Sequence, residues 1–187
     1  MRSAAIVLGA LFGLVILVGL FVWSSYNGLV TSELNVDNQW AQVEVQYQRR
    51  YDLVPNLVES VKGIFEQERA IITAVTEART RYGDAVDPDA QAAAASDLDS
   101  ALSRLLVIVE NYPEIRSQQN VQSLMDELAG TENRIAVERA RYNIAVTEFN
   151  GKLRRFPSNL VARMFGFERR TLYQSTTGAD QPPPVRF

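Results

Sequence analysis

The apolar positions of this chain form one continuous run at the amino terminus and periodic stripes after it. The run from Ala4 to Trp23 contains no charged residue. A helix rises about 1.5 Å per residue, so about 20 residues match the roughly 30 Å hydrocarbon core of a bilayer. The run predicts a transmembrane helix over residues 4–25, preceded by a short flank at 1–3. A cleaved signal sequence is the alternative, but the run exceeds the roughly 7–15 apolar residues typical of one.

The flanks of the apolar run indicate its orientation. Arg2 precedes the run, whereas the first basic residues after it are Arg49 and Arg50. Basic residues close to a span, within roughly 15–20 positions, favour the cytoplasmic side. We therefore expect the amino terminus inside and the remaining chain outside. Within the run, Gly9 and Gly13 place two small residues on one helix face, a spacing that predicts self-association.

A periodic stripe follows the run, with apolar residues at steps of three and four, as in a helix that buries one face. The stripe predicts one long helix that ends near Tyr82 and Gly83. Pro55 lacks a backbone donor and its ring clashes with the preceding turn, so we expect a kink or a broken turn near Tyr51. The stripe comprises Trp40, Val43, Tyr47, Tyr51, Val54, Val58, Val61, Phe65, Ile72 and Val75.

Two further helices are expected. Asp87 and Pro88 are typical of a helix start and predict a second helix over 89–111. A third helical region runs from about 118 to 155, with Gly130 inside it. Either the helix tolerates this glycine or the chain breaks and reverses there, which would return the basic carboxyl-terminal end towards the membrane. Two stripes support these helices: Leu98, Leu102, Leu105 and Val109 in the second, and Val121, Leu124, Leu128, Ile135, Tyr142, Val146, Phe149, Leu153 and Phe156 in the third.

The connections between these helices are short, which makes consecutive helices antiparallel. The fold class predicted is all-α: a single-pass transmembrane helix followed by an elongated antiparallel helical bundle with coiled-coil-like packing. The bundle domain is expected over residues 26–170, with short amphipathic turns near 160–167. Residues 171–187 have too little apolar surface to pack, so we expect a disordered tail.

Composition excludes several kinds of chemistry. The chain has no cysteine and no histidine, which removes disulfides, thiolate or imidazole metal sites and Ser/His/Asp triads. Asp97 and Asp99 point to different faces of a helix, so they do not converge as an acid–base pair. Nucleotide-binding and metalloprotease motifs are absent from the sequence. We expect no catalytic residues, no metal and no cofactor.

Charge is distributed unevenly, because from Gly151 onward seven basic residues face two acidic ones in a chain of net charge −3. This basic end either meets anionic lipid or an acidic partner, or makes the tail soluble. It includes a candidate docking segment with Phe156, Pro157, Ser158, Asn159, Phe165 and Phe167. A sequence pI of about 5.1 and the lack of a recognition motif argue against nucleic acid as a partner.

Two segments combine polar groups with the apolar stripes. The first holds Arg49, Arg50, Asp52, Pro55, Asn56 and Glu59, and the second holds Glu132, Asn133 and Arg134. We expect a polar layer in which Glu132 and Asn133 satisfy Arg49 or Arg50 and so set the register of the helices. The alternative is a site for a ligand or a protein partner.

The same segments resemble the LemA family. The resemblance runs in order through Tyr26-Asn27-Gly28-Leu29-Val30, Arg49 to Glu59, Ala74-Val75-Thr76-Glu77-Ala78-Arg79, Tyr112-Pro113, Gly130 to Val137, Tyr142-Asn143, Phe156-Pro157-Ser158-Asn159-Leu160-Val161 and Phe165-Gly166-Phe167. It implies a bacterial, single-pass membrane protein with an all-helical domain. The family has no established catalytic residues, so the resemblance informs fold and location more than function.

Two functions are consistent with these observations. One is a non-enzymatic scaffold of the bacterial inner membrane that associates with membrane lipid and with further copies of itself, and organises or remodels the membrane. The other is an adaptor or ligand-binding module of an envelope system, which uses the two polar segments for an unidentified partner.

Overall fold

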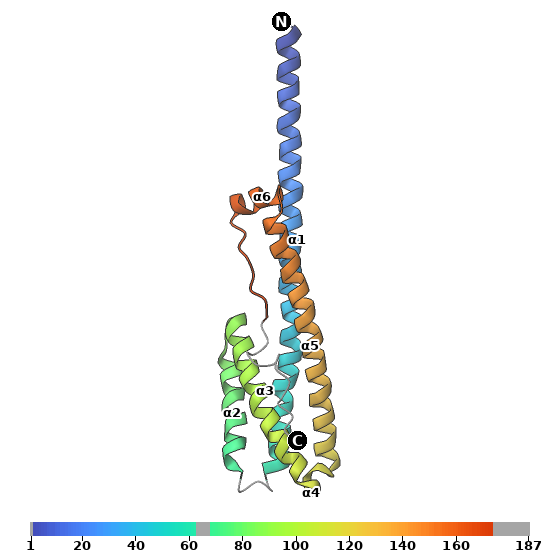
Figure 1. Cartoon of the computed structure of the whole chain (residues 1–187), viewed down its shortest axis with the longest axis vertical. Coiled ribbons are helices and arrows are strands. Elements are labelled where there is room, and N and C mark those ends of the chain that lie inside the picture. Colours follow the sequence, from blue (N-terminus) through green and yellow to red (C-terminus); the bar gives the residue numbers. More distant parts are fainter. Residues whose placement is uncertain (1, 63–67, 174–187) are drawn as a thin grey trace, which may run out of the picture. The chain divides into compact units, whose positions relative to one another are not determined.

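The computed structural model of the protein describes residues 2–62 and 68–173. Within these ranges the regular elements are all helical, which confirms the all-α prediction (Figure 1). They are α1 (Arg2–Lys62), α2 (Arg69–Asp84), α3 (Pro88–Asn111), α4 (Pro113–Arg116), α5 (Gln119–Arg154) and α6 (Ser158–Phe165).

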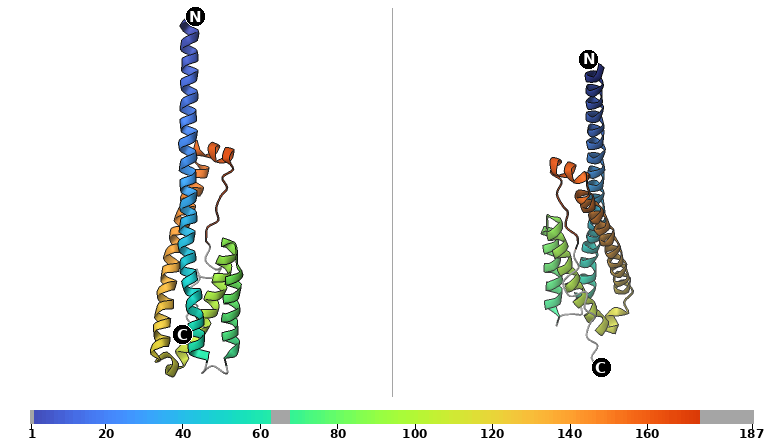
Figure 2. Two further views of the ribbon diagram at one scale, coloured as in Figure 1. Left: turned by 180° about the vertical axis from the view of Figure 1, so that it is seen from behind. Right: turned by 45° about the horizontal axis from the view of Figure 1, so that its top comes forward.

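The helices contribute to two compact units. The first unit contains the described residues up to Ala41 together with Ala140–Leu172, and therefore the start of α1, the end of α5 and α6. The second unit contains Gln42–Arg139 and Tyr173, and therefore the end of α1, α2, α3, α4 and the start of α5. Figure 2 gives two further views of these helices.

The prediction of one long first helix up to Tyr82 is wrong. The described part of α1 ends at Lys62, and a separate helix, α2, begins at Arg69. The two run antiparallel, because Arg79 contacts Tyr51 whereas the later Tyr82 stacks on the earlier Tyr47. An antiparallel pair buries its apolar residues in one core, so the stripe continues in sequence although the chain reverses. Phe65 of the expected stripe lies outside the described residues.

The broken turn expected near Tyr51 does not form, because α1 continues through Pro55. Pro55 lies on the exposed side of the helix, while its neighbours Val54 and Leu57 are fully buried. Burial of one face supplies most of the stability of a helix in a protein, so packing offsets the single missing hydrogen bond.

The core of the second unit contains residues of all three predicted stripes together with Leu57, Ala78, Ala101 and Ile115, which were not predicted. Residues of α1, α2, α3, α4 and α5 meet in it: Val54, Leu57, Val61, Val75, Ala78, Leu98, Ala101, Leu102, Leu105, Val109, Ile115, Val121 and Leu128. The second helix is confirmed as α3, whose first turn is capped by Asp87, because the side chain of Asp87 accepts a 2.8 Å hydrogen bond from the amide of Ala90.

The third helix is confirmed as α5, and it runs through Gly130 without a break. A Cβ atom built on Gly130 would meet nothing within 4 Å, so this position faces open space and α5 tolerates the glycine. The chain reversal that a break at Gly130 would have supplied lies instead between α1 and α2.

In the first unit, α1 and α5 run antiparallel. Trp40 stacks on Tyr142 with ring centroids 5.2 Å apart, and Lys152 reaches the backbone of Gly28. Leu29 is buried with Val161 and Ala162 of α6, and Val22, Leu153 and Phe167 pack around them. The expectation that Phe156 belongs to the buried stripe is wrong: it is 79% exposed, because α5 ends at Arg154 and the stripe ends with it.

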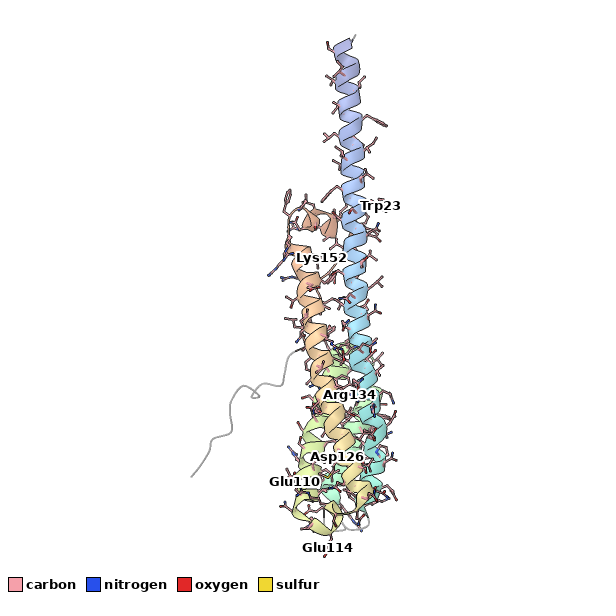
Figure 3. The ribbon with its side chains drawn as sticks, turned by 90° about the vertical axis from the view of Figure 1, so that its right-hand side faces the viewer. Trp23, Glu110, Glu114, Asp126, Arg134 and Lys152 are labelled. Carbon is pink, nitrogen blue, oxygen red and sulfur yellow. The ribbon has the colours of Figure 1, made fainter. Side chains whose placement is uncertain are left out.

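The apolar run forms the amino-terminal part of α1. It has a mean hydropathy of 2.8 over its most apolar 18 residues, and none of that window is buried. Figure 3 shows its side chains projecting outward from the helix before Trp23. Among the described residues, this is the helix long and apolar enough to cross a membrane. Of the predicted tail at 171–187, residues 174–187 lie outside the described chain.

Candidate functional site

Arg50 is the most deeply buried charged residue described in the second unit, with 2% of its surface exposed. It lies on the core-facing side of α1 because Tyr47 and Val54, three residues before and four after it, are buried on the same stripe. A guanidinium group at such a position requires partners, because an unpaired buried charge is strongly unfavourable.

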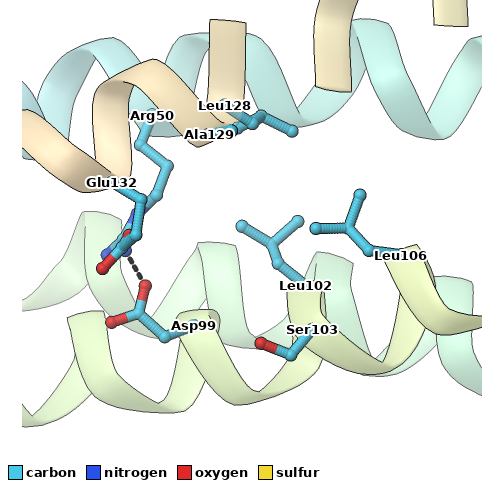
Figure 4. Close-up of a pocket in the computed structure, with 8 residues that line it drawn as sticks. All are labelled: Arg50, Asp99, Leu102, Ser103, Leu106, Leu128, Ala129 and Glu132. Atoms are coloured by element: carbon cyan, nitrogen blue, oxygen red, sulfur yellow. Dashed lines mark hydrogen bonds and ion pairs between the residues drawn. The ribbon is translucent and has the colours of Figure 1, made fainter. Parts of the chain in front are cut away.

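The guanidinium of Arg50 joins three helices. Its Nη1 pairs with Asp99 of α3 and with Glu132 of α5, at 3.1 Å from Glu132 Oε2. Its Nη2 donates a 3.1 Å hydrogen bond to the backbone carbonyl of Ala95 in α3. Figure 4 shows the head group of Arg50 beside the carboxylate of Glu132 and joined by a dashed line to Asp99.

A second arginine completes the cluster. Arg139 Nη2 lies 3.3 Å from Asp99 Oδ2, and Arg139 Nε donates a 3.1 Å hydrogen bond to the hydroxyl group of Tyr47. We call Arg50, Asp99, Glu132, Arg139 and Tyr47 the arginine layer. Its two cations and two carboxylates balance, so the layer carries no net charge with which to attract an ion.

Burial shifts the pKa values of groups in the layer. It lowers the pKa of Arg50, an effect that the Glu132 carboxylate opposes. Burial also raises the pKa of Tyr47, against the opposing charge of Arg139, and raises the pKa of the neighbouring Tyr82 to about 12. An arginine in a protein stays protonated and both phenols stay neutral near pH 7, so these groups act there as hydrogen-bonding and ion-pairing groups rather than as acids or bases.

The structure unites only part of the predicted polar layer. Arg50 and Glu132 meet as expected, but Arg49 pairs separately with Glu127 of α5 at 2.7 Å, with both side chains more than 40% exposed. The Asp52 carboxylate accepts a hydrogen bond from Gln48 of its own helix. The other predicted members lie on exposed surface: Pro55, Asn56, Glu59, Asn133 and Arg134.

Sequence reasoning missed Asp99 and Arg139. The prediction that Asp97 and Asp99 point to different faces of one helix is confirmed. Asp97 pairs with Arg81 at 3.6 Å on the surface, whereas Asp99 belongs to the arginine layer. The spacing of Glu132 and Arg139, seven residues or two helical turns apart, was a signal that both lie on one face of α5.

A cavity of about 280 Å³ adjoins the arginine layer. One end is polar and the other is formed by leucine side chains of α3 and α5 (Figure 4). Its lining residues are Arg50, Asp99, Leu102, Ser103, Leu106, Leu128, Ala129 and Glu132. At the polar end the Nη atoms of Arg50 are paired with Asp99, Glu132 and Ala95, whereas its Nε is buried without a hydrogen-bond partner among the described residues.

The candidate docking segment lies in the first unit, around α6. Its aromatic rings pack on Tyr26 of α1, with centroids 4.8 Å away for Phe165 and 5.8 Å away for Phe167. Gly166 ends α6 in the left-handed conformation, with φ of 74°, and this turn directs Phe167 back to α1. Phe156 is exposed, whereas Pro157, Ser158 and Asn159 are half-buried at the start of α6.

Arg170 and Thr171, in the segment after α6, form ion pairs and hydrogen bonds with α1 and α5 in the first unit. The guanidinium of Arg170 lies 3.2 Å from carboxylate oxygens of both Glu33 and Asp37 in α1. The Asn150 side chain of α5 donates to the carbonyl of Arg170 and accepts from its amide. Tyr142 donates a hydrogen bond to the carbonyl of Thr171. These bonds hold α6 in place from its carboxyl-terminal side.

The two glycines of the predicted association face lie in the apolar part of α1. A Cβ atom at Gly9 or Gly13 would meet nothing within 4 Å. Among the described residues, therefore, no side chain occupies the groove that the two glycines leave.

Comparison with known proteins identifies the family. The chain matches the LemA family over residues 39–187, which is most of its length. The chain belongs to the LemA family. The matched region of this LemA protein includes the whole arginine layer and α6.

Curated relatives of this LemA protein include two magnetosome proteins. It is 28% identical to magnetosome protein MamQ 2 of Paramagnetospirillum magneticum and 25% identical to MamQ of Magnetospirillum gryphiswaldense, in each case over 84% of this chain and 67% of the relative. It is 22% identical to Protein LemA of Metamycoplasma hominis, over 80% of this chain and 69% of that protein.

The charged groups of the arginine layer pair with one another in this LemA protein. In the part of the chain that the structure describes, no three acidic side chains group as metal ligands. Both carboxylates of the arginine layer are engaged by arginines. The arrangement can hold α1, α3 and α5 in register, and the names of the family and of its relatives are not those of enzymes.

Proposed function

We propose that this LemA protein is a non-enzymatic, membrane-anchored scaffold of the bacterial inner membrane that self-associates and organises or remodels the membrane around it. The observation that carries the proposal is the continuity of α1, a single helix from Arg2 to Lys62. The most apolar 18-residue window of its amino-terminal part has no buried residue, and its carboxyl-terminal part contributes to the core of the second unit. One helix thus connects the membrane span with the bundle.

The glycine pair supports self-association. Gly9 and Gly13 are one turn apart on α1, and neither position has a neighbour that a Cβ atom would touch. Small residues at this spacing allow the backbone of a second helix to approach closely. A second copy of this chain supplies such a helix with the same face.

The polar chemistry supports a role without catalysis. The buried arginine layer is internally neutral and leaves no carboxylate poised as a general base. Relatives that are named magnetosome proteins support a role in a cell structure. For this chain we infer an inner-membrane location with the amino terminus inside, as the basic Arg2 favours, and the bundle on the opposite, outer side.

Substitution of the glycine pair tests the proposal. Full-length protein is labelled separately with donor and acceptor dyes, reconstituted in vesicles and measured by energy transfer at increasing protein-to-lipid ratios. Gly9→Leu with Gly13→Leu should reduce energy transfer at least fivefold. Gly19→Leu is the matched control, because Gly19 also lies in the apolar run with no neighbour within 4 Å but about 80–120° around the helix from the pair. Equal transfer in all three proteins would contradict association through this face.

The cavity beside Arg50 favours a second candidate, an adaptor or ligand-binding module that uses the arginine layer for a partner. Glu132 is the layer residue suited to a test, because its side chain is 48% exposed and its loss disturbs the core least. If Glu132→Gln abolishes binding of a purified envelope partner without lowering the melting temperature, the adaptor function is supported. A lower melting temperature with binding intact assigns Glu132 a structural role.

A further inference from the structure

The outward face of α6 carries apolar side chains that no part of the described first unit covers. Leu160 and Met164, four residues apart on one face, are 57% and 63% exposed. Phe156 and Phe165 are also exposed, so four large apolar side chains reach solvent within ten residues. Such a concentration marks an interaction site, because exposed apolar residues are otherwise scattered singly over a protein surface.

The opposite face of α6 fixes where this patch lies. Val161 and Ala162 are buried against Leu29, and Val22 packs on the same cluster. Val22 is the residue before Trp23, the last position of the apolar run. The helix α6 is therefore attached to α1 at the end of the membrane span.

The direction of α6 suits a membrane surface. In Figures 1 and 2, α6 lies across α1 rather than along it. A helix that crosses a spanning helix at the end of its apolar part runs along the interface between water and lipid. Trp23 and Tyr26 lie at the end of the apolar run of α1, and Trp and Tyr residues are enriched where a membrane-spanning helix leaves the bilayer.

The charges around α6 are complementary to lipid head groups. Residues 152–169, which we call the α6 segment, contain five basic residues and one acidic residue, Glu168. The basic residues are all exposed: Lys152, Arg154, Arg155, Arg163 and Arg169. An amphipathic helix with an apolar face and surrounding cations is the kind that binds anionic bilayers.

We propose that α6 is an interfacial helix that binds the anionic phospholipid head groups of the bilayer in which α1 is anchored, with Leu160 and Met164 inserted below the head groups. The contacts to Leu29 and Tyr26 hold α6 at that level, and the exposed arginines bind phosphate groups. The proposal requires α1 to span the membrane, but it does not require self-association, because every residue it uses belongs to one chain.

Spin labelling of full-length protein in vesicles tests the proposal. The natural chain has no cysteine, so Leu160→Cys and Ile144→Cys each carry a single nitroxide label. Ile144 is the matched control, a 60% exposed apolar residue on α5 in the same unit. In vesicles with 30% phosphatidylglycerol, we compare the ratio of oxygen accessibility to accessibility for a water-soluble nickel relaxant. This ratio should be at least threefold higher for the Leu160 label than for the Ile144 label. In pure phosphatidylcholine, this difference should fall by at least half.

Charge neutralisation gives the second measurement. The combined substitution Arg154→Gln, Arg155→Gln, Arg163→Gln and Arg169→Gln should remove the lipid dependence of the Leu160 label, while circular dichroism shows that the helix content is kept. Shielding of the label from both oxygen and nickel would indicate a protein partner and overturn the proposal. Equal nickel accessibility at Leu160 and Ile144 in anionic vesicles, or shielding that anionic lipid does not change, would also overturn it.

Discussion

The arginine layer makes a quantitative prediction for Arg50→Met. Methionine keeps most of the volume of arginine and removes its charge, so the substitution measures pairing more than cavity formation. It leaves Asp99 with Arg139 alone, and it leaves Glu132 without the cation 3.1 Å from it.

The size of the effect follows from the exposure of each partner. Asp99 is the less exposed, with 28% of its side chain accessible, so its lost bond should cost about 1.5–3 kcal/mol. Glu132 is 48% exposed and regains water, so its share is about 0.5 kcal/mol. The apolar methionine side chain offsets about 1 kcal/mol of this loss. The net destabilisation is about 1–2.5 kcal/mol, or a fall in melting temperature of roughly 2–10 °C for a chain of this size.

The adjacent Arg49 provides a matched control. It also makes one ion pair to α5, with Glu127, but its side chain is 45% exposed and that of Glu127 is 42% exposed. Arg49→Met should therefore cost less than about 1 kcal/mol. Both variants are compared with the natural chain by thermal unfolding in detergent, followed by circular dichroism at 222 nm.

The melting temperatures of Arg50→Met and Arg49→Met can contradict the prediction. If Arg50→Met and Arg49→Met lower the melting temperature equally, or if neither lowers it, the layer does not hold the helices together and the reasoning fails. A double-mutant cycle refines the result, because the coupling of Arg50 with Asp99 should exceed its coupling with Glu132.

Three further predictions concern single side chains. Burial raises the pKa of Tyr82 to about 12, so the unfolded phenol loses its proton first; the contribution of Tyr82 to stability should be constant up to about pH 10 and fall between about pH 10 and pH 12, by up to about 1.4 kcal/mol per pH unit. Tyr82→Phe should reduce this alkaline fall in denaturant titrations. Gly166→Ala should raise hydrogen exchange at the Phe167 amide roughly 5- to 30-fold, since a left-handed φ of 74° costs a residue with a side chain about 1–2 kcal/mol; unchanged exchange would contradict this. Asp87→Ala should lower the melting temperature by roughly 2–4 °C, because α3 loses its amino-terminal cap. Asp84→Ala should leave the melting temperature unchanged or slightly higher, because Asp84 is the last residue of α2, where a negative charge is unfavourable.

Periodicity in the sequence predicted most helices because each buries one face. The apolar run, α3 and α5 follow from spacing alone, and the cap at Asp87 confirms the predicted start of α3. The reversal between α1 and α2 could not be predicted in the same way. Val61 and Val75 are buried in one core from two antiparallel helices, and in sequence their spacing is indistinguishable from that of a single helix.

The sequence predicted only part of the candidate site. Arg50 and Glu132 were recognisable as partners because both interrupt apolar stripes. Asp99 was not, because its distance from Arg50 depends on the placement of α3 against α1, which follows from long-range packing. The exposure of Phe156 was unpredictable for a related reason, since it depends on where α5 ends. Local pattern therefore predicted elements, and tertiary contacts decided which polar residues meet.

We propose that α1 assembles this LemA protein in the membrane through the face of Gly9 and Gly13. The most direct measurement is a count of subunits by single-molecule photobleaching, with full-length protein extracted from its membrane into polymer-bounded lipid discs. We expect discs with two or more copies for the natural chain and for Gly19→Leu, and single copies for Gly9→Leu with Gly13→Leu. Single copies for the natural chain at high expression, or equal copy numbers in all three proteins, would contradict it.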